Sequence, residues 1–342
     1  PAGVCCQNGF LRVSAEGARI ETYRPEHRAR AAASWAYMPT EVPRRWVQFL
    51  GEVFPGDDSL ARQLLLQQFA GACLIGVAPI YERCLVLHGS GRNGKSVAMD
   101  VISALFPVGT VCALRPQRFD DDRMIGVLVG KRLNAAGEIP DGNITGSDRF
   151  KTTVSGQRLT ARPPYSLPIT FHPRCGHIFA CNSLPGTSDT SPGYWRRFML
   201  LAFDADFEGN QQEKGLTDRL VREELPGIAS WAIEGAVMLL TQGEYSVPRS
   251  SRDGMLQWKY NADAVLAFTT EECDECAASV GATTKELHGS YKAWCERYGY
   301  RCLALNRFGT RLTAIGKGSV KTGGVRRVPL RIKDSPTNVG WH

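Results

Sequence analysis

The sequence lacks several features that would assign a protein to a class at once. No window offers the ~18 consecutive apolar residues of a membrane span. The start, PAGVCCQNGF, has neither the basic nor the apolar segment of a signal peptide. Fixed-period repeats and low-complexity tracts are also missing. Because 43% of the residues are hydrophobic and 22% are charged, disordered and fibrous classes are excluded and no membrane partner is expected.

Cysteine is present, but without the pattern of a disulfide framework. The 342 residues include 11 cysteines, an odd number with irregular spacing, and a chain of this length can build a core without covalent staples. We therefore expect reduced thiols in a soluble, cytoplasmic protein. Cys273 and Cys276 form a C-x-x-C, but no second pair has this spacing, which favours thiols over a zinc site. The first residue is Pro1, which suggests a piece of a longer protein.

Positive charge is concentrated near the end of the chain. The net charge is +7, from 41 Lys and Arg against 34 Asp and Glu. Nine basic residues and no acidic residue lie between Arg301 and Lys333, so the rest of the chain is close to neutral. Clustered Lys and Arg bind polyanions by displacing counterions from phosphates. A polyanion partner is the favoured interpretation, and a solvated basic face is the alternative.

Short apolar runs and helix-period runs alternate along the chain, which predicts an α/β fold with a largely parallel sheet. A linker is expected at 245–253, between the sheet-forming part and the basic segment. The predicted strands are 84–88, 132–136, 177–181 and 198–203, and the predicted helices are 44–80 with a break at 55–58, 97–106, 216–240 and 256–275.

The most specific motif is GSGRNGKS at 89–96, which matches G-x-x-x-x-G-K-[ST] in full. It follows a predicted strand and precedes a predicted helix, the context in which this loop binds a nucleoside triphosphate. Backbone amides would surround the phosphates, Lys95 would reach the outer phosphates and Ser96 would ligate Mg²⁺. A glycine turn without a ligand is the alternative. The expected binding residues are Gly89, Ser90, Gly91, Arg92, Asn93, Gly94, Lys95 and Ser96.

Phosphoryl transfer to water also needs a carboxylate at the end of a neighbouring strand. Glu138, after RLNAAG, is the candidate. Its predicted strand is weakly hydrophobic, because Asn134 and Gly137 stand where aliphatic residues are usual. An exposed glutamate at a strand end is therefore the alternative.

Six sequence blocks in a fixed order resemble one family. They are WVQFL, HGSGRNGKS, GKRLNAAGEIP, FKTTVSGQRLTARPPYSLPITFHP, IFACNSLP and GYWRRFMLLAF. Together they resemble the helicase portion of phage and plasmid primase-helicases, a superfamily 3 group related to poxvirus primase-helicases. The resemblance implies a hexameric AAA+ ring that hydrolyses ATP at subunit interfaces. The ring would draw single-stranded DNA through its channel during replication of a phage or mobile element.

The resemblance also implies three parts of the chain. They are a helical, collar-like N-terminal region at 1–80, an AAA+ core at 81–245, and a helical connector with a winged-helix module at 246–342. Within the core, Glu138 occupies the acidic Walker B position and would hold Mg²⁺ together with Ser96. Many relatives carry two adjacent acids there, whereas the next acid in this chain is Asp141.

The same resemblance assigns a sensor and an arginine finger. Asn182 falls on the sensor asparagine, which would orient water or the γ-phosphate, or would otherwise stabilise its own turn. Arg196 and Arg197 stand where the family keeps the arginine that acts on the nucleotide of a neighbouring subunit. The motif does not say which of the two is the finger.

A hairpin before the sensor strand is expected to point into the ring channel. The family places a Lys-Gly-Arg block there, and the tip contains Pro163 and Pro164. Cations would contact backbone phosphates and an aromatic ring would stack on bases; a hairpin facing solvent is the alternative. The expected contacts to single-stranded DNA are Lys151, Arg158, Arg162 and Tyr165.

The basic segment is typical of a winged helix-turn-helix. A helix at 284–300 has an apolar face, Asn306 is the expected N-cap of a second helix, and VKTGGVRRVPLRI predicts a hairpin around Gly323 and Gly324. Duplex DNA is the expected partner, and a wing that only packs against the ring is the alternative. Arg307 and Arg311 would address the major groove, while Lys321, Arg326 and Arg327 would contact phosphate or the minor groove.

Three functions remain open at this point. An ATP-dependent DNA helicase or translocase is favoured. An origin-binding initiator with weak unwinding is the first alternative, and a P-loop small-molecule kinase is the second. Hydrolysis stimulated by DNA separates the helicase from the kinase, and strand displacement compared with duplex footprinting separates it from the initiator.

Overall fold

A computed structural model describes residues 2–139, 148–187, 189–207, 213–300 and 302–333. The chain divides into two compact units, Pro1–Leu256 and Gln257–His342. The second unit therefore begins later than the boundary expected at 245. Within the described residues, no helix has the length and apolar character that a membrane crossing requires.

The centre of the first unit is a parallel sheet, which confirms the predicted α/β class. Its 5 strands lie in the order β10-β4-β9-β6-β5, and every neighbouring pair is parallel. The strand β4 is an apolar run because a central parallel strand is covered on both faces. The bounds are Cys84–His88 for β4, Val111–Cys112 for β5, Leu133–Ala136 for β6, Gly176–Cys181 for β9 and Phe198–Ala202 for β10.

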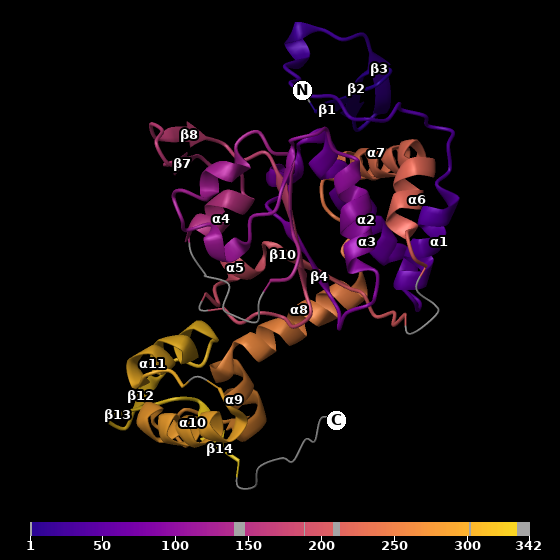
Figure 1. Ribbon diagram of the computed structural model, residues 1–342. Coiled ribbons are helices and arrows are strands. Elements are labelled where there is room, and N and C mark those ends of the chain that lie inside the picture. The colour runs from indigo at the N-terminus through magenta and orange to yellow at the C-terminus, as the bar shows by residue number, and fades with distance from the viewer. Residues whose placement is uncertain (1, 140–147, 188, 208–212, 301, 334–342) are drawn as a thin grey trace. The chain divides into compact units, whose positions relative to one another are not determined.

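Helices cover this sheet from two sides. Figure 1 shows α1, α2, α3, α6 and α7 on one side of β4 and β10, and α4, α5 and the β7–β8 hairpin on the other. Their bounds are Arg44–Val53 (α1), Ser59–Ile75 (α2), Lys95–Ala104 (α3), Asp148–Val154 (α4), Pro192–Trp195 (α5), Leu216–Glu223 (α6), Leu225–Gln242 (α7), Leu159–Ala161 (β7) and Ile169–Phe171 (β8). Short 3-10 turns lie at Pro25–His27, Ala78–Tyr81, Pro116–Arg118 and Ile125–Leu128.

The helices α2 and α7 pack unusually closely. A Cβ on Gly71 would lie 2.0 Å from the carbonyl oxygen of Ala232. A Cβ on Gly235 would lie 2.5 Å from the backbone of Gln67, whose side-chain amide donates to the carbonyl of Trp231 at 2.7 Å. Glycine is therefore required where the two backbones meet, and a buried polar side chain crosses the contact.

The N-terminal region is not wholly helical, which corrects the expectation for 1–80. Its first part is an antiparallel sheet of β1 (Gly3–Cys6), β2 (Gly9–Ser14) and β3 (Gly17–Glu21). The first turn ends in Asn-Gly, which is a hairpin signal. Val4, Leu11 and Val13 join the core formed by α2 and α7, so this sheet and the part built on the parallel sheet share one core.

The second unit contains helices and short strands. The elements are α8 (Arg249–Ala262), which begins in the first unit and within the expected linker, α9 (Ala264–Glu272), β11 (Cys273–Glu275), α10 (Thr284–Tyr298), α11 (Leu305–Ala314), β12 (Val320–Thr322), β13 (Val325–Arg327) and β14 (Leu330–Ile332). The predicted hairpin around Gly323 and Gly324 is confirmed as β12–β13, and β14 pairs with β11.

Two details of this unit differ from the sequence prediction. The helix expected at 256–275 is broken at Asp263, whose side chain caps α9 by accepting from the amides of Val265 and Leu266. The helix α11 begins at Leu305 with Ala304 as its N-cap, so Asn306 lies inside the helix. The apolar face predicted for α10 is confirmed, because Leu287, Tyr291, Trp294 and Cys295 are all buried in the core of this unit.

Asn134 is a buried polar residue of β6 that forms several hydrogen bonds. It is also the residue that weakened the strand prediction there. Its Oδ1 accepts from the amide of Leu114 at 2.7 Å, and its Nδ2 donates to the Leu114 carbonyl at 2.9 Å. The same Nδ2 lies 3.1 Å from Nδ1 of His177 on the adjacent strand β9. Because Nδ2 is a donor, Nδ1 of His177 accepts this hydrogen bond and carries no proton. Burial holds the pKa of His177 down at about 3.

This buried histidine predicts an acid-sensitive fold. An unfolded histidine binds a proton near pH 6.5, whereas folded His177 stays neutral down to about pH 3. The unfolded state therefore binds more protons in this window, and the free energy of unfolding falls as the pH decreases from 6.5 towards 3, by at most about 1.4 kcal/mol per pH unit. Urea unfolding of His177→Phe at a series of pH values should show a shallower decrease than wild type. His172→Phe, at an exposed histidine, is the control, and equal slopes for His177→Phe and wild type would contradict the assignment.

Candidate active site

The glycine-rich loop connects β4 to α3, so its predicted strand-loop-helix context is confirmed. A Cβ on Gly89 would lie 2.0 Å from Nδ2 of Asn93 and 2.5 Å from the carbonyl oxygen of Phe203. Gly94 has φ of 87°, and a Cβ there would lie 2.6 Å from Cγ1 of Val53. The first and last glycines of the motif are therefore required by the tight turn and by the approach of α1.

Lys95 is buried in the loop and held by it. Its Nζ donates to the carbonyl of Gly89 at 2.6 Å and to Oδ1 of Asn93 at 3.1 Å. Asn93 in turn donates to the carbonyl of Phe203 at 3.0 Å, which ties the loop to the residue after β10. Burial lowers the pKa of Lys95, while Cys181 and Glu138 act in the opposite direction. The ammonium is thus already placed beside the backbone that would surround a phosphate.

A cavity of about 410 Å³ opens over this loop. Glu138 follows β6, Asn182 follows β9 and the loop follows β4, and the carboxyl ends of parallel strands meet at one edge of a sheet. Lys95, Ser96, Glu138 and Asn182 all line the cavity. The structure therefore brings together the predicted phosphate, metal, catalytic and sensor residues.

Of the eight predicted loop residues, those from Gly91 to Ser96 line the cavity. Gly89 is buried beneath the loop and Ser90 is exposed beside it. Glu138 has a φ of 41°, in the left-handed region that a non-glycine residue seldom adopts. The amide of Ile139 donates to the carbonyl of Ala180 at 2.8 Å and holds the chain there. Strain of this kind is typical of active sites. Asp141 lies outside the described residues.

Several residues of the cavity were not found by sequence analysis. Arg45, Phe49 and Glu52 come from α1, and Glu213 comes from the segment before α6. Nη2 of Arg45 lies 3.1 Å from Glu52 and 3.0 Å from Glu213, so the cation joins the two elements. The spacing of α1 indicated only a core helix, and no local signal showed that it would face a loop far along the chain.

The oxygen ligands in the cavity suit Mg²⁺. The Ser96 hydroxyl and the Glu138 carboxylate both line it, and Mg²⁺ prefers oxygen ligands, usually one or two from protein, with waters and substrate phosphates completing the shell. Among the described residues, no group of three or more His, Cys, Asp and Glu side chains has the arrangement of an all-protein metal site. The serine and glutamate oxygens therefore fit a metal that binds together with a triphosphate.

The two candidate finger arginines lie at the opposite edge of the sheet. They precede β10, whose first residue Phe198 pairs with Cys84, the first residue of β4. The loop follows the far end of β4, about 16 Å away for a strand of this length at ~3.3 Å per residue. Neither arginine lines the cavity of its own chain.

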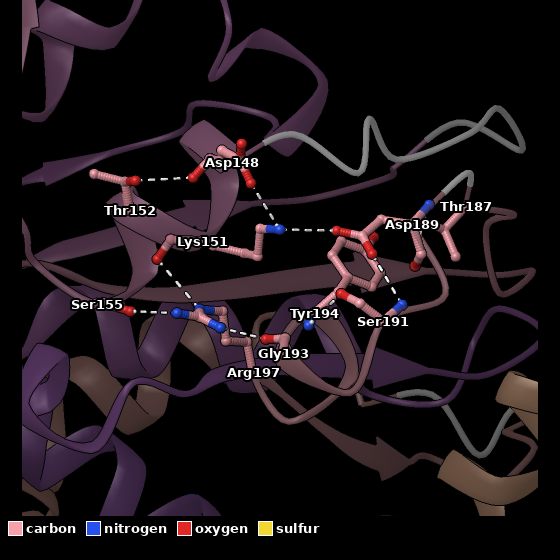
Figure 2. A network of polar contacts seen from close by, with 10 residues as sticks. All are labelled: Asp148, Lys151, Thr152, Ser155, Thr187, Asp189, Ser191, Gly193, Tyr194 and Arg197. Carbon is pink, nitrogen blue, oxygen red and sulfur yellow. Dashed lines mark hydrogen bonds and ion pairs between the residues drawn. The ribbon is translucent and has the colours of Figure 1, made fainter. Parts of the chain in front are cut away.

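The surroundings of these two arginines differ sharply. The Arg197 side chain is 7% exposed, whereas that of Arg196 is 62% exposed. Figure 2 shows Arg197 donating to the Lys151 carbonyl at 3.2 Å and to Oγ of Ser155 at 2.9 Å. Arg197 also donates to the carbonyl of Gly193. Arg196 contacts only Glu82, at 3.2 Å, among the described residues.

The predicted contacts to single-stranded DNA fall into two groups. Arg158, Arg162 and Tyr165 are exposed on the β7–β8 hairpin, and Tyr165 is fully exposed at its tip. Lys151 instead forms ion pairs with Asp148 at 2.8 Å and Asp189 at 3.1 Å. Lys151 is thus paired within the chain, unlike the hairpin residues, and the contact expected between it and DNA stays a prediction.

The basic residues of the second unit also divide. Arg307, Lys321 and Arg326 are exposed. The side chain of Arg311 is mostly covered, and its Nε donates to Oδ2 of the buried Asp263 at 2.8 Å. Arg311 therefore fastens α11 to the start of α9, and the contact expected between it and a DNA groove stays a prediction.

Arg327 is only partly exposed, and its Nη1 donates to the carbonyl of Gly281 at 2.8 Å. This contact holds β13 against the segment before α10. The exposed positive surface of the second unit therefore rests on fewer of the predicted residues than the charge count implied.

Comparisons with known proteins agree with these findings. Residues 87–197 match a family model described as a family of unknown function, DUF5906. Residues 261–325 match one described as Poxvirus D5 protein-like. The chain is 28% identical over 193 residues to the "Putative helicase L207/L206" of Acanthamoeba polyphaga mimivirus, a match that covers 54% of this chain and 19% of that protein. The resemblance seen in the sequence is confirmed, because the chain is similar both to a poxvirus D5-like family model and to a putative helicase.

Solved structures give a weaker likeness. An apo structure of the NrS-1 C-terminal region has a TM-score of 0.48 and 12% identity, covering 94% of this chain and 82% of that chain. A second apo structure of this region, spanning its residues 305–718, has a TM-score of 0.48 and 13% identity, covering 92% and 80%. Likeness at this level does not establish a shared activity.

The geometry of the loop predicts the effect of Lys95→Ala. Removing this lysine from the cavity should abolish ATP hydrolysis and weaken binding of a fluorescent ATP analogue at least tenfold, because the outer phosphates lose their cation. Fluorescence titration and a coupled hydrolysis assay measure the two effects. Lys131→Ala, at a partly exposed lysine that donates to the Gly109 carbonyl, is the control. Hydrolysis at the wild-type rate in Lys95→Ala would contradict the site.

Proposed function

We propose that this chain is the motor part of an ATP-dependent DNA helicase or translocase with an AAA+ core, working as a ring. The observation that supports this function most is that the residues lining the cavity and the candidate finger arginines lie at opposite edges of the sheet. The cavity holds Lys95, Ser96, Glu138 and Asn182 but neither candidate finger, while the exposed Arg196 lies at the other edge of the sheet. Each protomer then supplies one half of a site and needs a neighbour for the other half.

Within one protomer, the cavity residues divide the chemistry. Amides of Gly91 to Ser96 bind the triphosphate, and Lys95 exchanges its contacts with Gly89 and Asn93 for phosphate oxygens. Ser96 and Glu138 would hold Mg²⁺, which would neutralise charge on the phosphates. Glu138 polarises the attacking water, and Asn182 orients it from the next strand.

Arg196 is the arginine that completes the site of a neighbour. A finger must reach across an interface and offset negative charge in the transition state, so it needs an exposed guanidinium. Arg196 has one, paired among the described residues with the partly exposed Glu82, whereas Arg197 is enclosed by its own chain. A ring of six such protomers, as the sequence resemblance implied, would give every cavity one Arg196.

The β7–β8 hairpin is the proposed contact to single-stranded DNA in the channel of that ring. It presents Arg158 and Arg162 for backbone phosphates and the fully exposed Tyr165 for stacking on bases. Leu167 is also largely exposed beside Tyr165, which adds apolar surface for bases. Exposed large apolar residues at a hairpin tip are otherwise unfavourable in water.

The second unit is the proposed contact to duplex DNA, as a winged-helix module. The order α10, α11 and the β12–β13 hairpin supports this assignment, with Arg307 on α11 and Lys321 and Arg326 on the hairpin. These exposed cations also favour an origin-binding initiator as the second candidate function. Strand displacement by the purified chain distinguishes the helicase, because an initiator with weak unwinding would protect duplex DNA without separating it.

Mixtures of variant subunits test whether Arg196 acts as an arginine finger on a neighbouring subunit. Arg196→Ala alone should lower ATP turnover at least roughly a thousandfold, because transition-state charge loses its partner, with nucleotide affinity unchanged. Mixing Arg196→Ala subunits with Lys95→Ala subunits should restore part of the turnover, since some interfaces then combine an intact loop with an intact arginine. Arg222→Ala, at another exposed arginine, is the control. A mixture that stays inactive at every ratio counts against action across an interface.

The salt dependence of duplex binding tests the second unit. Replacing Arg307, Lys321 and Arg326 by alanine should reduce the slope of log affinity against log salt by about 0.9 for each phosphate that is no longer neutralised. Fluorescence anisotropy of a labelled duplex at several salt concentrations measures the slope. The control is a variant in which Arg24, Arg28 and Arg30 are replaced by alanine. It removes the same charge, but from exposed residues of the first unit. If only this control changes the slope, the second unit is not the contact.

A further inference from the structure

The segment that carries Arg196 is anchored on both sides by partly buried polar contacts. On one side, Arg197 donates to the Lys151 carbonyl and to the Ser155 hydroxyl, both at the end of α4, and to the Gly193 carbonyl within its own turn. Burial lowers the pKa of Arg197, against the opposing effect of Glu82. A guanidinium with all three contacts in this environment has one orientation, so the backbone at Arg196 is held as well.

On the other side, Asp189 links the same turn to α4. Its Oδ1 accepts from the amide of Ser191 at 2.9 Å, and its Oδ2 accepts from Nζ of Lys151 at 3.1 Å. Ser191 is the N-cap of α5, and its hydroxyl accepts from the amide of Tyr194 at 3.3 Å. The contacts therefore run from α4 through Asp189 and the cap of α5 to Arg196, as Figure 2 shows for all but the last residue.

Asp189 and Lys151 are both ionised in this arrangement. Burial alone would raise the pKa of Asp189, but the Ser191 hydroxyl and amide and the Lys151 ammonium lower it. Contacts with Asp148 and Asp189 raise the pKa of Lys151. The Asp189 side chain is 14% exposed and that of Lys151 is 24% exposed, so the pair is less screened than an ion pair on the open surface.

We infer that Asp189, Lys151 and Arg197 are positioning residues for the finger, and that their role is exerted on the ATP site of a neighbouring subunit. This inference rests on the proposed function. They hold the turn from 189 to 197 against α4 so that Arg196 leaves the surface in one direction. Because α4 also leads into the β7–β8 hairpin, the finger is fixed to the element that precedes the proposed DNA contact.

Displacing Arg196 is expected to change the rate of ATP hydrolysis much more than losing the ion pair changes the stability of the fold. A single partly exposed ion pair contributes little to stability. A displacement of ~1 Å in a group that acts on the transition state can lower a rate about a hundredfold. Loss of the Asp189–Lys151 pair should therefore lower turnover, while stability and nucleotide binding change little.

Asp189→Asn is the variant that tests the inference. Asparagine keeps the oxygen that accepts from Ser191 but removes the charge that holds Lys151. We expect kcat for ATP to fall at least tenfold, with KM, the affinity for a fluorescent ATP analogue and the melting temperature close to wild type. Asp189→Glu, which keeps the charge, should retain more turnover than Asp189→Asn. Asp253→Asn removes an exposed carboxylate of an i,i+4 pair with Arg249 and is the matched control.

The decisive measurement uses mixed subunits. Asp189→Asn subunits mixed with Lys95→Ala subunits should regain turnover, because the intact loop of the first then receives a correctly held Arg196 from the second. A wild-type kcat for Asp189→Asn, or a loss of turnover that mixing does not restore, would overturn the inference. Lys151→Gln removes the same pair from α4 and replaces Asp189→Asn if that variant does not fold.

A parallel mixture separates this inference from the proposed function. Arg196→Ala subunits are mixed with the same Lys95→Ala subunits. Recovery with Arg196→Ala but not with Asp189→Asn would leave the shared site intact and refute only the positioning role. Failure of both mixtures would refute the shared site itself.

Discussion

The polarity of a parallel sheet is the constraint on which the proposed mechanism depends. All carboxyl ends lie at one edge, so the loop after β4, Glu138 after β6 and Asn182 after β9 meet in one cavity. The same polarity places the residues before β10 at the other edge, where Arg196 is exposed. A chain built this way separates phosphate binding from the finger by the length of a strand, which makes association the natural way to complete the site.

Most of the cavity could be predicted because its signals are local. A glycine-rich loop needs its glycines for the turn that it makes, and a residue after a buried strand is placed by that strand alone. The residues of α1 could not be found in the same way. Phe49 looks like any core residue of an amphipathic helix, and only the fold brings its ring within 3.1 Å of the position that a Cβ on Gly94 would occupy. The N-terminal sheet was missed although Asn8 and Gly9 marked its first turn.

Charge was the least reliable guide, because a sequence shows a charged residue but not its partner. Lys151 and Arg311 were expected to face DNA, and both are paired with acids far along the chain, Asp189 and Asp263. Arg196 and Arg197 are adjacent and chemically identical, yet one is enclosed and the other is exposed. Tertiary contacts decide these cases, apart from the local i,i+3 pair between Asp148 and Lys151.

The cations without a buried partner are therefore the better candidates for binding phosphate. A paired guanidinium or ammonium must break its own contacts before it can bind another anion, which offsets part of what it would gain. Arg158 and Arg162 on the hairpin, and Arg307 and Arg326 in the second unit, lose little when they bind, because they are exposed in the chain alone. Lys151, Arg197 and Arg311 are instead paired within the chain. They hold elements in place, so that exposed neighbouring residues point outward.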